Sequence, residues 1–390
     1  MKVFQINTVY NSGSTGRIAA DIKHALEQDG HECFVAFGRG ESLEKNTECV
    51  ADKLDLYSHV LMTRLTDKTG YYSKKPTEKL IRLIKEFSPD IIHLHNIHGY
   101  YVNIEMLFEF LAEYNKPIVW TLHDCWPFTG HCAYFDMAEC DKWKTGCYKC
   151  PALADYPKTL RDNSKNNYLL KEQLFNLVDR VVFVTPSNWL ADKVAESFLN
   201  KYLIKVINNG IDTDAFVYGE GNIREKYTLG DKKIVLGVAS IWDKRKGFED
   251  FVALSEYLAD EYQIVLVGLS EKQIKKLPKS IIGIRRTESR EELAQLYSAA
   301  SVLFNPTYED NYPTVNLEAL SCGTPVITYN TGGSPESAFI TSEECVGKKD
   351  YGAICDKIYR AKRVEIDKEK INIAQMKTAY LKLYAEIKER

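Results

Sequence analysis

The sequence has no long hydrophobic run. Its longest apolar stretches, around Val181–Val184 and Ile264–Gly268, are far shorter than the ~20 residues that span a bilayer. The N-terminus runs directly into a strand-like pattern and lacks the basic and apolar regions of a secretory signal. Lys and Arg number 51 against 54 Asp and Glu, and a net charge of -3 creates no field to attract nucleic acid. We therefore expect a cytoplasmic protein, at most touching the inner face of a membrane, with no nucleic-acid partner.

Two further absences narrow the chemistry. No repeat at solenoid spacing and no low-complexity segment is visible, so ordinary globular domains are expected. No Asp-x-Asp motif stands at a predicted strand end in the second half of the chain. We therefore expect no metal or other cofactor to act in catalysis.

What the sequence does contain is an alternation of strands and helices that runs twice. The 390 residues suffice for two domains. The first series opens with a strand at Val3–Thr8, a turn at 11–16 and an amphipathic helix at Arg17–Gln28, and the second begins after the turn Asn208–Asp212. Such alternation favours parallel sheets with helical crossovers. We predict an α/β fold of two Rossmann-like, doubly wound domains facing each other across a cleft, because such sheets bind ligands at the carboxyl ends of their strands.

The predicted domain limits follow from this pattern. The first domain covers residues 1–207 and contains a cysteine-rich insertion at 125–151. The second covers residues 208–367. A C-terminal helix at 368–390 is expected to pack back on the first domain. The remaining predicted strands are 32–37, 91–95, 118–123 and 181–186 in the first series, and 234–239, 263–267, 283–285, 302–305 and 325–329 in the second.

The cysteines are concentrated in one short stretch. Five of the ten lie between residues 125 and 150, and Cys147-Tyr148-Lys149-Cys150 has the spacing of a structural zinc knuckle. Four thiolates could close a tetrahedral site and order a loop that buries little apolar surface. Free thiols or a disulfide are the alternatives, because Cys132 and Cys140 are spaced more widely than a usual knuckle pair. The predicted zinc ligands are Cys132, Cys140, Cys147 and Cys150.

The strongest motif lies at residues 305–327, where a strand leads through an acidic loop into a helix and then to Gly-Thr-Pro-Val. This segment resembles the signature of glycosyltransferase family 4, whose fold is the two-domain GT-B type. In that family a first acid contacts the donor sugar and a second, eight positions later, binds the ribose. Glu318 matches the second acid, and Asp310 has the spacing of the first although glutamate is usual there. Glu309 precedes it, so either residue could contact the sugar.

The loop after the first strand of the second series, Val238–Gly247, resembles the phosphate-binding loop of the same family. The family has an arginine directly after the strand and a lysine before a glycine, which together neutralise the leaving diphosphate. Lys246 matches the lysine. Ser240 occupies the place of the arginine, so we assign the missing charge to Arg245, whose guanidinium can bind phosphate oxygens in a bidentate manner.

In the first domain the resemblance points to two further places. Gly13 and Gly16 would bring the backbone close to the donor, although a plain β-α turn has the same composition. His123, at the end of a buried strand, matches a family histidine beside the transferred sugar. His95 lies at another strand end and could line the acceptor side.

Taken together, the resemblance implies a retaining, metal-independent glycosyltransferase that acts on a glycan or lipid-linked acceptor. The run from Trp120 to Cys150 is similar to bacterial enzymes of capsular, colanic-acid-type or O-antigen polysaccharide assembly. A nucleotide-sugar epimerase of the same fold and a non-catalytic nucleotide-sugar-binding scaffold are the alternatives. The predicted catalytic residues are His123, Asp310 and Lys246. The predicted donor-binding residues are Gly13, Gly16, Ser240, Arg245, Lys246, Glu309, Asp310, Asn311, Thr314, Val315 and Glu318.

Overall fold

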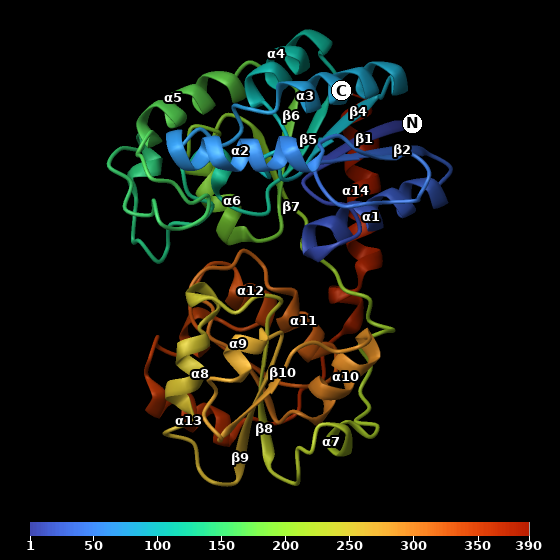
Figure 1. The fold of residues 1–390 in the computed structure, drawn as a ribbon. Coiled ribbons are helices and arrows are strands. Elements are labelled where there is room, and N and C mark those ends of the chain that lie inside the picture. The colour runs from blue at the N-terminus through green and yellow to red at the C-terminus, as the bar shows by residue number, and fades with distance from the viewer. Residues whose placement is uncertain (390) are drawn as a thin grey trace. The chain divides into compact units, whose positions relative to one another are not determined.

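The computed structural model describes residues 1–389, which form two compact units (Figure 1). The first unit comprises Met1–Asn208 together with the C-terminal residues from Lys377 onward, and the second comprises Asn209–Met376. Each unit is a parallel β-sheet with helices on both faces, so the predicted α/β class is confirmed. Within residues 1–389, no helix combines the length and the apolar character needed to cross a bilayer.

The first unit is built on a seven-stranded sheet in the order β3-β2-β1-β4-β5-β6-β7. All of its strand pairs are parallel, and β1, the third strand of the sheet, pairs with β2 on one side and β4 on the other. The chain therefore winds outward from β1 in both directions, as in a doubly wound fold. The strands are β1 (Lys2–Asn7), β2 (Glu32–Phe37), β3 (Thr47–Cys49), β4 (Ile91–Leu94), β5 (Ile118–Thr121), β6 (Val181–Thr185) and β7 (Leu203–Val206).

Three helices of this unit begin at side-chain caps. Asp52 caps α2 with a capping box, Asn103 caps α4, and Ser187 caps α6. The predicted turn at 11–16 is wrong in part, because residues 13–16 already form the first turn of α1. The helices are α1 (Gly13–Gln28), α2 (Lys53–Thr66), α3 (Lys74–Phe87), α4 (Ile104–Tyr114), α5 (Ser164–Phe175), α6 (Asn188–Ala195) and α14 (Ile373–Lys388).

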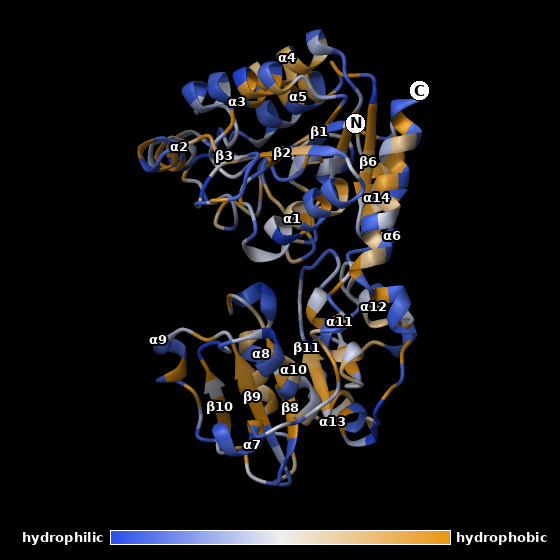
Figure 2. Cartoon of the chain, turned by 90° about the vertical axis from the view of Figure 1, so that its right-hand side faces the viewer, coloured by the Kyte–Doolittle hydropathy of each residue, from blue (hydrophilic) through white to orange (hydrophobic). Residues whose placement is uncertain are grey.

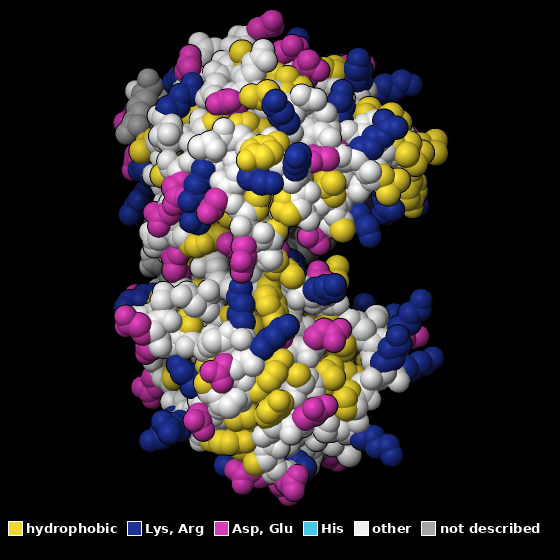
Figure 3. Space-filling view, turned by 90° about the vertical axis from the view of Figure 1, so that its left-hand side faces the viewer, with side chains coloured by type: hydrophobic (Ala, Val, Ile, Leu, Met, Phe, Trp, Pro, Cys, Tyr) yellow, Lys and Arg dark blue, Asp and Glu magenta, His cyan; other side chains and the backbone are white. Residues whose placement is uncertain are grey.

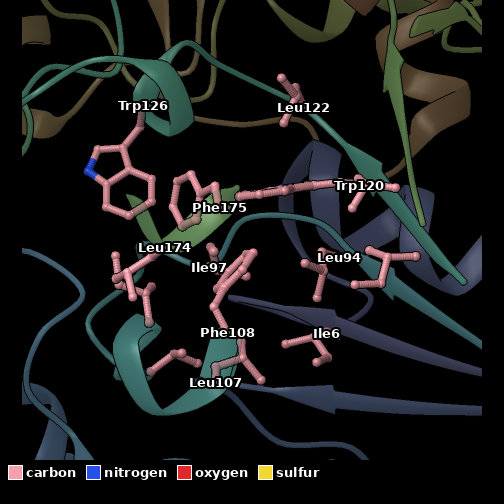
Figure 4. Close-up of a cluster of buried hydrophobic side chains, with 14 of the residues drawn as sticks. Ile6, Leu94, Ile97, Leu107, Phe108, Trp120, Leu122, Trp126, Leu174 and Phe175 are labelled. Carbon is pink, nitrogen blue, oxygen red and sulfur yellow. The ribbon is translucent and has the colours of Figure 1, made fainter. Parts of the chain in front are cut away.

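The two faces of the first sheet differ in chemistry. Alternate residues of β1, β4 and β5, such as Ile6, Leu94 and Trp120, pack on Phe108 of α4 and Phe175 of α5 in a fully apolar core (Figure 4). On the opposite face, apolar Val3, Ile91 and Val119 are followed by polar residues towards the carboxyl ends of the strands. These polar residues are Gln5, His93, His95 and Thr121, all buried. Long buried parallel strands are usually apolar on both faces, so this polar stripe needs partners of its own.

The partners of the polar stripe come from α1 and α14. The Gln5 amide donates to the carbonyl of Ala19 in α1 (3.0 Å). The hydroxyl of Tyr384 in α14 bonds the Nδ1 atom of His93 (2.6 Å), and that of Tyr380 bonds Thr121 (2.8 Å). The C-terminal helix is thus fixed to the first sheet by hydrogen bonds as well as by burial.

The second unit repeats the strand order on a smaller sheet, β10-β9-β8-β11-β12, again with every pair parallel. Its strands are hydrophobic along most of their length (Figure 2), as expected for a sheet covered on both faces. The strands are β8 (Lys233–Val238), β9 (Tyr262–Val267), β10 (Ile281–Ile284), β11 (Val302–Asn305) and β12 (Val326–Thr328). The helices are α7 (Ile223–Lys226), α8 (Phe248–Leu254), α9 (Glu271–Ile274), α10 (Arg290–Ala299), α11 (Thr314–Ser321), α12 (Ser334–Ala338) and α13 (Tyr351–Arg360).

The C-terminal helix starts later than predicted. Residues Lys368–Ile371 form a short 3-10 helix, and α14 begins only at Ile373. The carbonyl of Ile371 accepts from Ile211 N, and Ile373 N donates to Ile211 O, both at 2.8 Å. These two bonds hold the backbone extended around Asn372, so that the 3-10 helix Lys368–Ile371 and α14 are separate helices.

Candidate active site

In both sheets the direction in which the chain adds successive strands reverses at an equivalent point. The strand order changes between β1 and β4 in the first unit and between β8 and β11 in the second. Open α/β sheets bind ligands outside the carboxyl ends of the strands at such switch points. The loops that follow these strands are therefore where a site is expected in each unit.

In the second unit the loop after β8 carries a cluster of basic residues. Residues Lys244–Lys246 form a single 3-10 turn, capped by the Asp243 side chain, which accepts from Lys246 N (3.1 Å). The next residue, Gly247, has a φ of +70°, and a Cβ placed on it would lie 2.3 Å from the carbonyl oxygen of Pro306. Only glycine fits there, and its fit brings the loop after β8 against the loop after β11.

The two loops are joined by contacts of their charged residues. The ammonium of Lys246 donates to Oδ2 of Asp310, and both side chains are largely buried. The Arg245 guanidinium donates to the carbonyl of Glu309 (2.9 Å). The backbone carbonyl of Arg245 in turn accepts a hydrogen bond from Tyr308 N (2.8 Å). The structure therefore brings together Arg245, Lys246, Glu309 and Asp310. In each of the two bonded pairs, Arg245 with Glu309 and Lys246 with Asp310, the residues are 64 positions apart in the chain.

Helix α11 starts directly beyond this pair. Its cap position is Pro313, and no side chain of the described residues caps it. The first amides of the helix, at Thr314 and Val315, thus lie at an uncapped positive end, where a phosphate is stabilised by the N–H groups and by the helix dipole. Glu318 is one turn further along and on the same face as Thr314. Its Oε2 atom accepts from the hydroxyl of the buried Tyr297 (2.9 Å).

The remaining predicted residues of this unit lie in the same loops. Ser240 is exposed just after β8, and Asn311 is buried between Asp310 and the start of α11. The carbonyl of Asp310 accepts from Gly333 N (3.1 Å), which fixes the acidic loop from its other side. All nine donor-binding residues predicted in the second half therefore belong to the loops that follow β8 and β11 or to helix α11.

In the first unit the equivalent region contains stacked histidines. His123 follows β5, and its ring lies 5.4 Å from that of His95, at the end of β4, nearly parallel to it. The two rings are joined by a hydrogen bond between His123 Nε2 and His95 Nδ1 (3.1 Å). Burial lowers the pKa of His123 to about 4, with the repulsion from His98 adding to the effect and Asp124 opposing it. His123 is therefore a neutral imidazole at pH 7.

The hydrogen bonds around His95 assign the tautomer of His123. The Gln5 amide nitrogen already donates to Ala19 O, so its oxygen faces His95 Nε2 (3.0 Å) and must accept from it. His95 Nδ1 then lacks a proton and accepts from His123 Nε2. This leaves the Nδ1 atom of His123 as a free lone pair in the described network. His95, which we expected to line an acceptor site, is 1 % exposed and supports His123 instead.

A buried pair next to His123 was missed. His98 Nε2 bonds the carboxylate of Asp124 (2.9 Å), and His98 Nδ1 lies 3.1 Å from the hydroxyl of Tyr156. Trp126 N also donates to Asp124 (3.0 Å). The signal was present in the sequence, because both residues stand in loops after adjacent strands, β4 and β5, where parallel strands bring their carboxyl ends together.

The glycines of the first unit occupy the start of α1. Gly13 is exposed at its first position, and Gly16 is buried against Val9, with its carbonyl accepting from Asn11 N (3.0 Å). The Asn7 amide donates to the carbonyls of Val9 and Thr15 (3.0 and 3.1 Å) and holds this segment beside the end of β1. The two glycines thus lie at the switch point of the first sheet.

The sequence matches two family models. Residues 15–215 match glycosyltransferase family 4, and residues 232–361 match the glycosyl transferases of group 1. The first match covers more than half of the chain. This protein belongs to glycosyltransferase family 4.

Among curated relatives, the chain is 27 % identical over 357 residues to WcaC of Escherichia coli K12, whose name assigns it to colanic acid biosynthesis as a glycosyl transferase. That match covers 86 % of this chain and 85 % of WcaC. The chain is also 27 % identical over 216 residues to the processive diacylglycerol alpha-glucosyltransferase of Acholeplasma laidlawii, covering 50 % of this chain and 64 % of that enzyme.

Solved structures show the fold of this glycosyltransferase. Sucrose-phosphate synthase of Thermosynechococcus elongatus matches with a TM-score of 0.71 over 99 % of both chains at 16 % identity. Anabaena HepE in complex with UDP-glucose matches with a TM-score of 0.68 over 99 % of this chain and 100 % of that one, at 14 % identity. The fold is GT-B, as the sequence predicted.

Proposed function

We propose that this glycosyltransferase moves a sugar from a nucleotide-sugar donor to a glycan or lipid-linked acceptor in the assembly of a cell-surface polysaccharide, with retention of anomeric configuration. The observation that carries the proposal is the ion pair of Lys246 and Asp310 beside the uncapped start of α11. The pathway is supported by the similarity to WcaC over most of both chains.

The donor is held mainly by the second unit. Its diphosphate takes Lys246 away from Asp310 and bonds the amides of Thr314 and Val315, where the helix dipole favours negative charge. Arg245 and the hydroxyl of Ser240 complete the phosphate contacts. Asp310, once released, accepts a hydroxyl of the donor sugar, and Glu318 accepts the ribose hydroxyls. The nearby Glu309 and Asn311 shape the loop.

The reaction is a single displacement on one face of the sugar. The acceptor oxygen forms a bond to the anomeric carbon while the bond from that carbon to the phosphate oxygen breaks, and the acceptor proton passes to the leaving phosphate. Lys246 and the α11 amides stabilise the charge that grows on the diphosphate, so the step needs no metal ion. His123, being neutral at pH 7, contributes a polar contact to the sugar and no charge. Gly13 and Gly16 allow close approach of the backbone.

A radiolabelled donor panel separates this proposal from its alternatives. A glycosyltransferase moves label to the lipid-linked or glycan fraction and releases one nucleoside diphosphate for each sugar transferred. An epimerase would interconvert the free donor without acceptor, and a scaffold would do neither. Nuclear magnetic resonance of the isolated product then gives the anomeric configuration, and inversion relative to the donor would contradict the retaining mechanism.

A lipid-linked acceptor requires contact with a membrane surface, and helix α2 supplies a suitable face. Leu54, Tyr57, Leu61 and Leu65 recur at helical spacing and are 78, 71, 57 and 44 % exposed. Leu160, 80 % exposed, extends this surface, since its amide donates to the carbonyl of Arg64 at the end of the helix (2.8 Å). Figure 3 shows the apolar side chains at the right-hand edge of the upper unit.

Five basic residues flank this apolar face, and Asp52 and Asp55 lie at the start of the same helix. Lys53, Arg64, Lys68, Lys158 and Arg161 are all exposed, and none of them takes part in an ion pair within residues 1–389. Exposed leucines and a tyrosine flanked by cations match the surface of a bilayer that contains anionic lipids. We therefore propose that α2 rests on such a membrane.

Co-sedimentation with vesicles tests this contact. The full chain should bind vesicles containing phosphatidylglycerol and bind pure phosphatidylcholine vesicles weakly. Leu61→Glu with Leu65→Glu should abolish sedimentation, whereas the matched Leu169→Glu, at a leucine exposed on α5, should not. Equal binding of both variants would contradict a role of α2, while transfer to a soluble acceptor would remain as a separate readout of catalysis.

A further inference from the structure

The cysteine-rich loop of the first unit forms a small pocket that takes no part in the proposed transfer reaction. Its walls include all four cysteines whose spacing suggested a metal site, Cys132, Cys140, Cys147 and Cys150, together with His131 and Trp143. The pocket has a volume of about 10 Å³, close to that of a single water-sized sphere. All four thiols are free of disulfide bonds.

The sulfur atoms already interact with one another and with the backbone. The side chains of Cys132 and Cys150, 18 residues apart in the chain, form a hydrogen bond. Cys147 Sγ accepts from the amide of Gly130 (3.1 Å), the kind of N–H to sulfur bond that orients a metal-binding thiolate. The first and last of the four proposed ligands, Cys132 and Cys150, are thus in contact, and the backbone of Gly130 holds Cys147 near Cys132.

Two buried groups beside the cysteines, an ammonium and an indole N–H, lie where a nearby negative charge would stabilise them. Lys171 is 1 % exposed, and its ammonium donates only to the carbonyls of Trp126 (2.7 Å) and Thr129 (3.0 Å). It forms no ion pair with a carboxylate of residues 1–389. The indole N–H of Trp143 is buried in the same region with no acceptor. The Lys171 ammonium also lies over the Trp126 ring, 3.4 Å from its centroid. A buried ammonium without a carboxylate and a buried donor without an acceptor are both costly, and a nearby cluster of thiolates would stabilise both.

His131 is a third such group. Its Nδ1 atom bonds the carboxylate of Asp67 (2.5 Å), and its buried Nε2 atom has no partner. A metal-bound histidine often bonds a carboxylate through one nitrogen and the metal through the other. His131 is therefore an alternative to Cys140 as the fourth ligand of a metal. Cys132, Cys147 and Cys150 are common to both sets.

We propose that this pocket binds one structural zinc ion through the thiolates of Cys132, Cys140, Cys147 and Cys150. Four thiolates around Zn²⁺ carry a net charge of -2, which Lys171 offsets from within the core. As the side chains of residues 1–389 are oriented in the structure, no three His, Cys, Asp or Glu residues are placed to hold a metal. Binding therefore requires the thiols to rotate inward. The loop already buries Phe128, Phe135 and Trp143, and zinc would add a cross-link between the partly buried Cys140, Cys147 and Cys150 and the core.

Metal analysis of the full chain, purified reduced and without chelators, tests the proposal. We expect about one zinc per chain, lost in Cys147→Ser with Cys150→Ser and kept in the control Cys345→Ser, whose thiol lies in the second unit. Cys140→Ser should lose zinc and His131→Ala should keep it. The reverse result for these two variants would overturn the four-cysteine set.

A measurement on the wild-type chain keeps the proposal testable if the variants fail to fold. Replacement of zinc by Co²⁺ should give the intense thiolate-to-cobalt absorption and the visible bands of a tetrahedral sulfur site. A chain that holds no zinc, takes up no Co²⁺ and is alkylated at all four thiols in its native state would overturn the proposal. A disulfide between Cys132 and Cys150 in the reduced preparation would do the same.

Discussion

The switch points of the two sheets have the same topology and opposite chemistry. In the second unit the loops after β8 and β11 carry charge, with Lys246 against Asp310 and Glu318 nearby. In the first unit the ends of β4 and β5 carry neutral, buried imidazoles, with His95 bonded to His123. The same strand order therefore supports a charged site in one unit and an uncharged polar site in the other.

This difference matches the two ends of a nucleotide sugar. A diphosphate is anionic and becomes more so as it leaves, which suits a lysine and a helix N-terminus. A sugar is neutral in the ground state, which suits an imidazole whose pKa of about 4 keeps it uncharged at pH 7. The comparison predicts that changes in the second unit affect binding and turnover together, whereas changes in the first unit affect turnover alone.

The largest effect is expected for Lys246→Ala. The variant loses the cation that meets the leaving diphosphate and leaves Asp310 unpaired, so kcat/KM should fall by about a hundredfold or more. Steady-state kinetics with a saturating acceptor measures this, and Lys275→Ala, at an exposed lysine of the same unit, is the control. A loss confined to the KM of the acceptor would contradict the assignment.

The second-largest effect is expected for His123→Ala, and it should fall on turnover and leave donor affinity nearly unchanged. Its contact with the sugar is proposed to strengthen in the transition state, so kcat should fall by about a hundredfold while donor affinity changes little. Calorimetry with the donor and single-turnover kinetics separate the two quantities. The comparison between the units fails if affinity and turnover decrease by equal factors.

Glu318→Ala should weaken donor binding by about 1.5 to 3 kcal/mol, or roughly 10- to 150-fold in Kd, because charge-assisted bonds to the ribose are lost. The same change also leaves the Tyr297 hydroxyl without its acceptor. Tyr297→Phe is therefore the matched control, and it should reduce thermal stability while keeping donor affinity. Unchanged donor affinity in folded Glu318→Ala would disprove the ribose contact.

The smallest effect concerns the pH dependence of stability. Burial lowers the pKa of His123 to about 4 and that of His59 to about 3, below the usual 6.5 of histidine in an unfolded chain. Between pH 6.5 and 4 the unfolded chain therefore binds more protons than the folded one, and the free energy of unfolding falls as pH falls. Each histidine contributes at most about 1.4 kcal/mol per pH unit. Urea denaturation at pH 7, 6 and 5 measures this, and constant stability would show that these imidazoles stay accessible to protons.

Much of the fold was predictable because both sheets are covered on two faces and most of their strand residues are apolar, although Gln5 and His93 interrupt the apolar runs of β1 and β4. The loops after β8 and β11 were also predictable, since their residues are close in sequence to strand ends. The role of His95 was not, because its contact with Gln5 joins residues 90 positions apart. The start of α1 was misplaced, since Gly13 and Gly16 suggested a turn where the structure has a helix. The late start of α14 depends on bonds to Ile211, which no local pattern reveals.

Calorimetry with nucleoside diphosphates tests the central claim most directly, because it separates diphosphate binding from sugar transfer. The full chain should bind one nucleoside diphosphate of its preferred base. Lys246→Ala in the second unit should weaken that binding at least tenfold, which corresponds to about 1.4 kcal/mol, and His123→Ala in the first unit should bind like the wild type. Wild-type affinity in Lys246→Ala, or an equal loss in both variants, would contradict the division of roles between the two switch points.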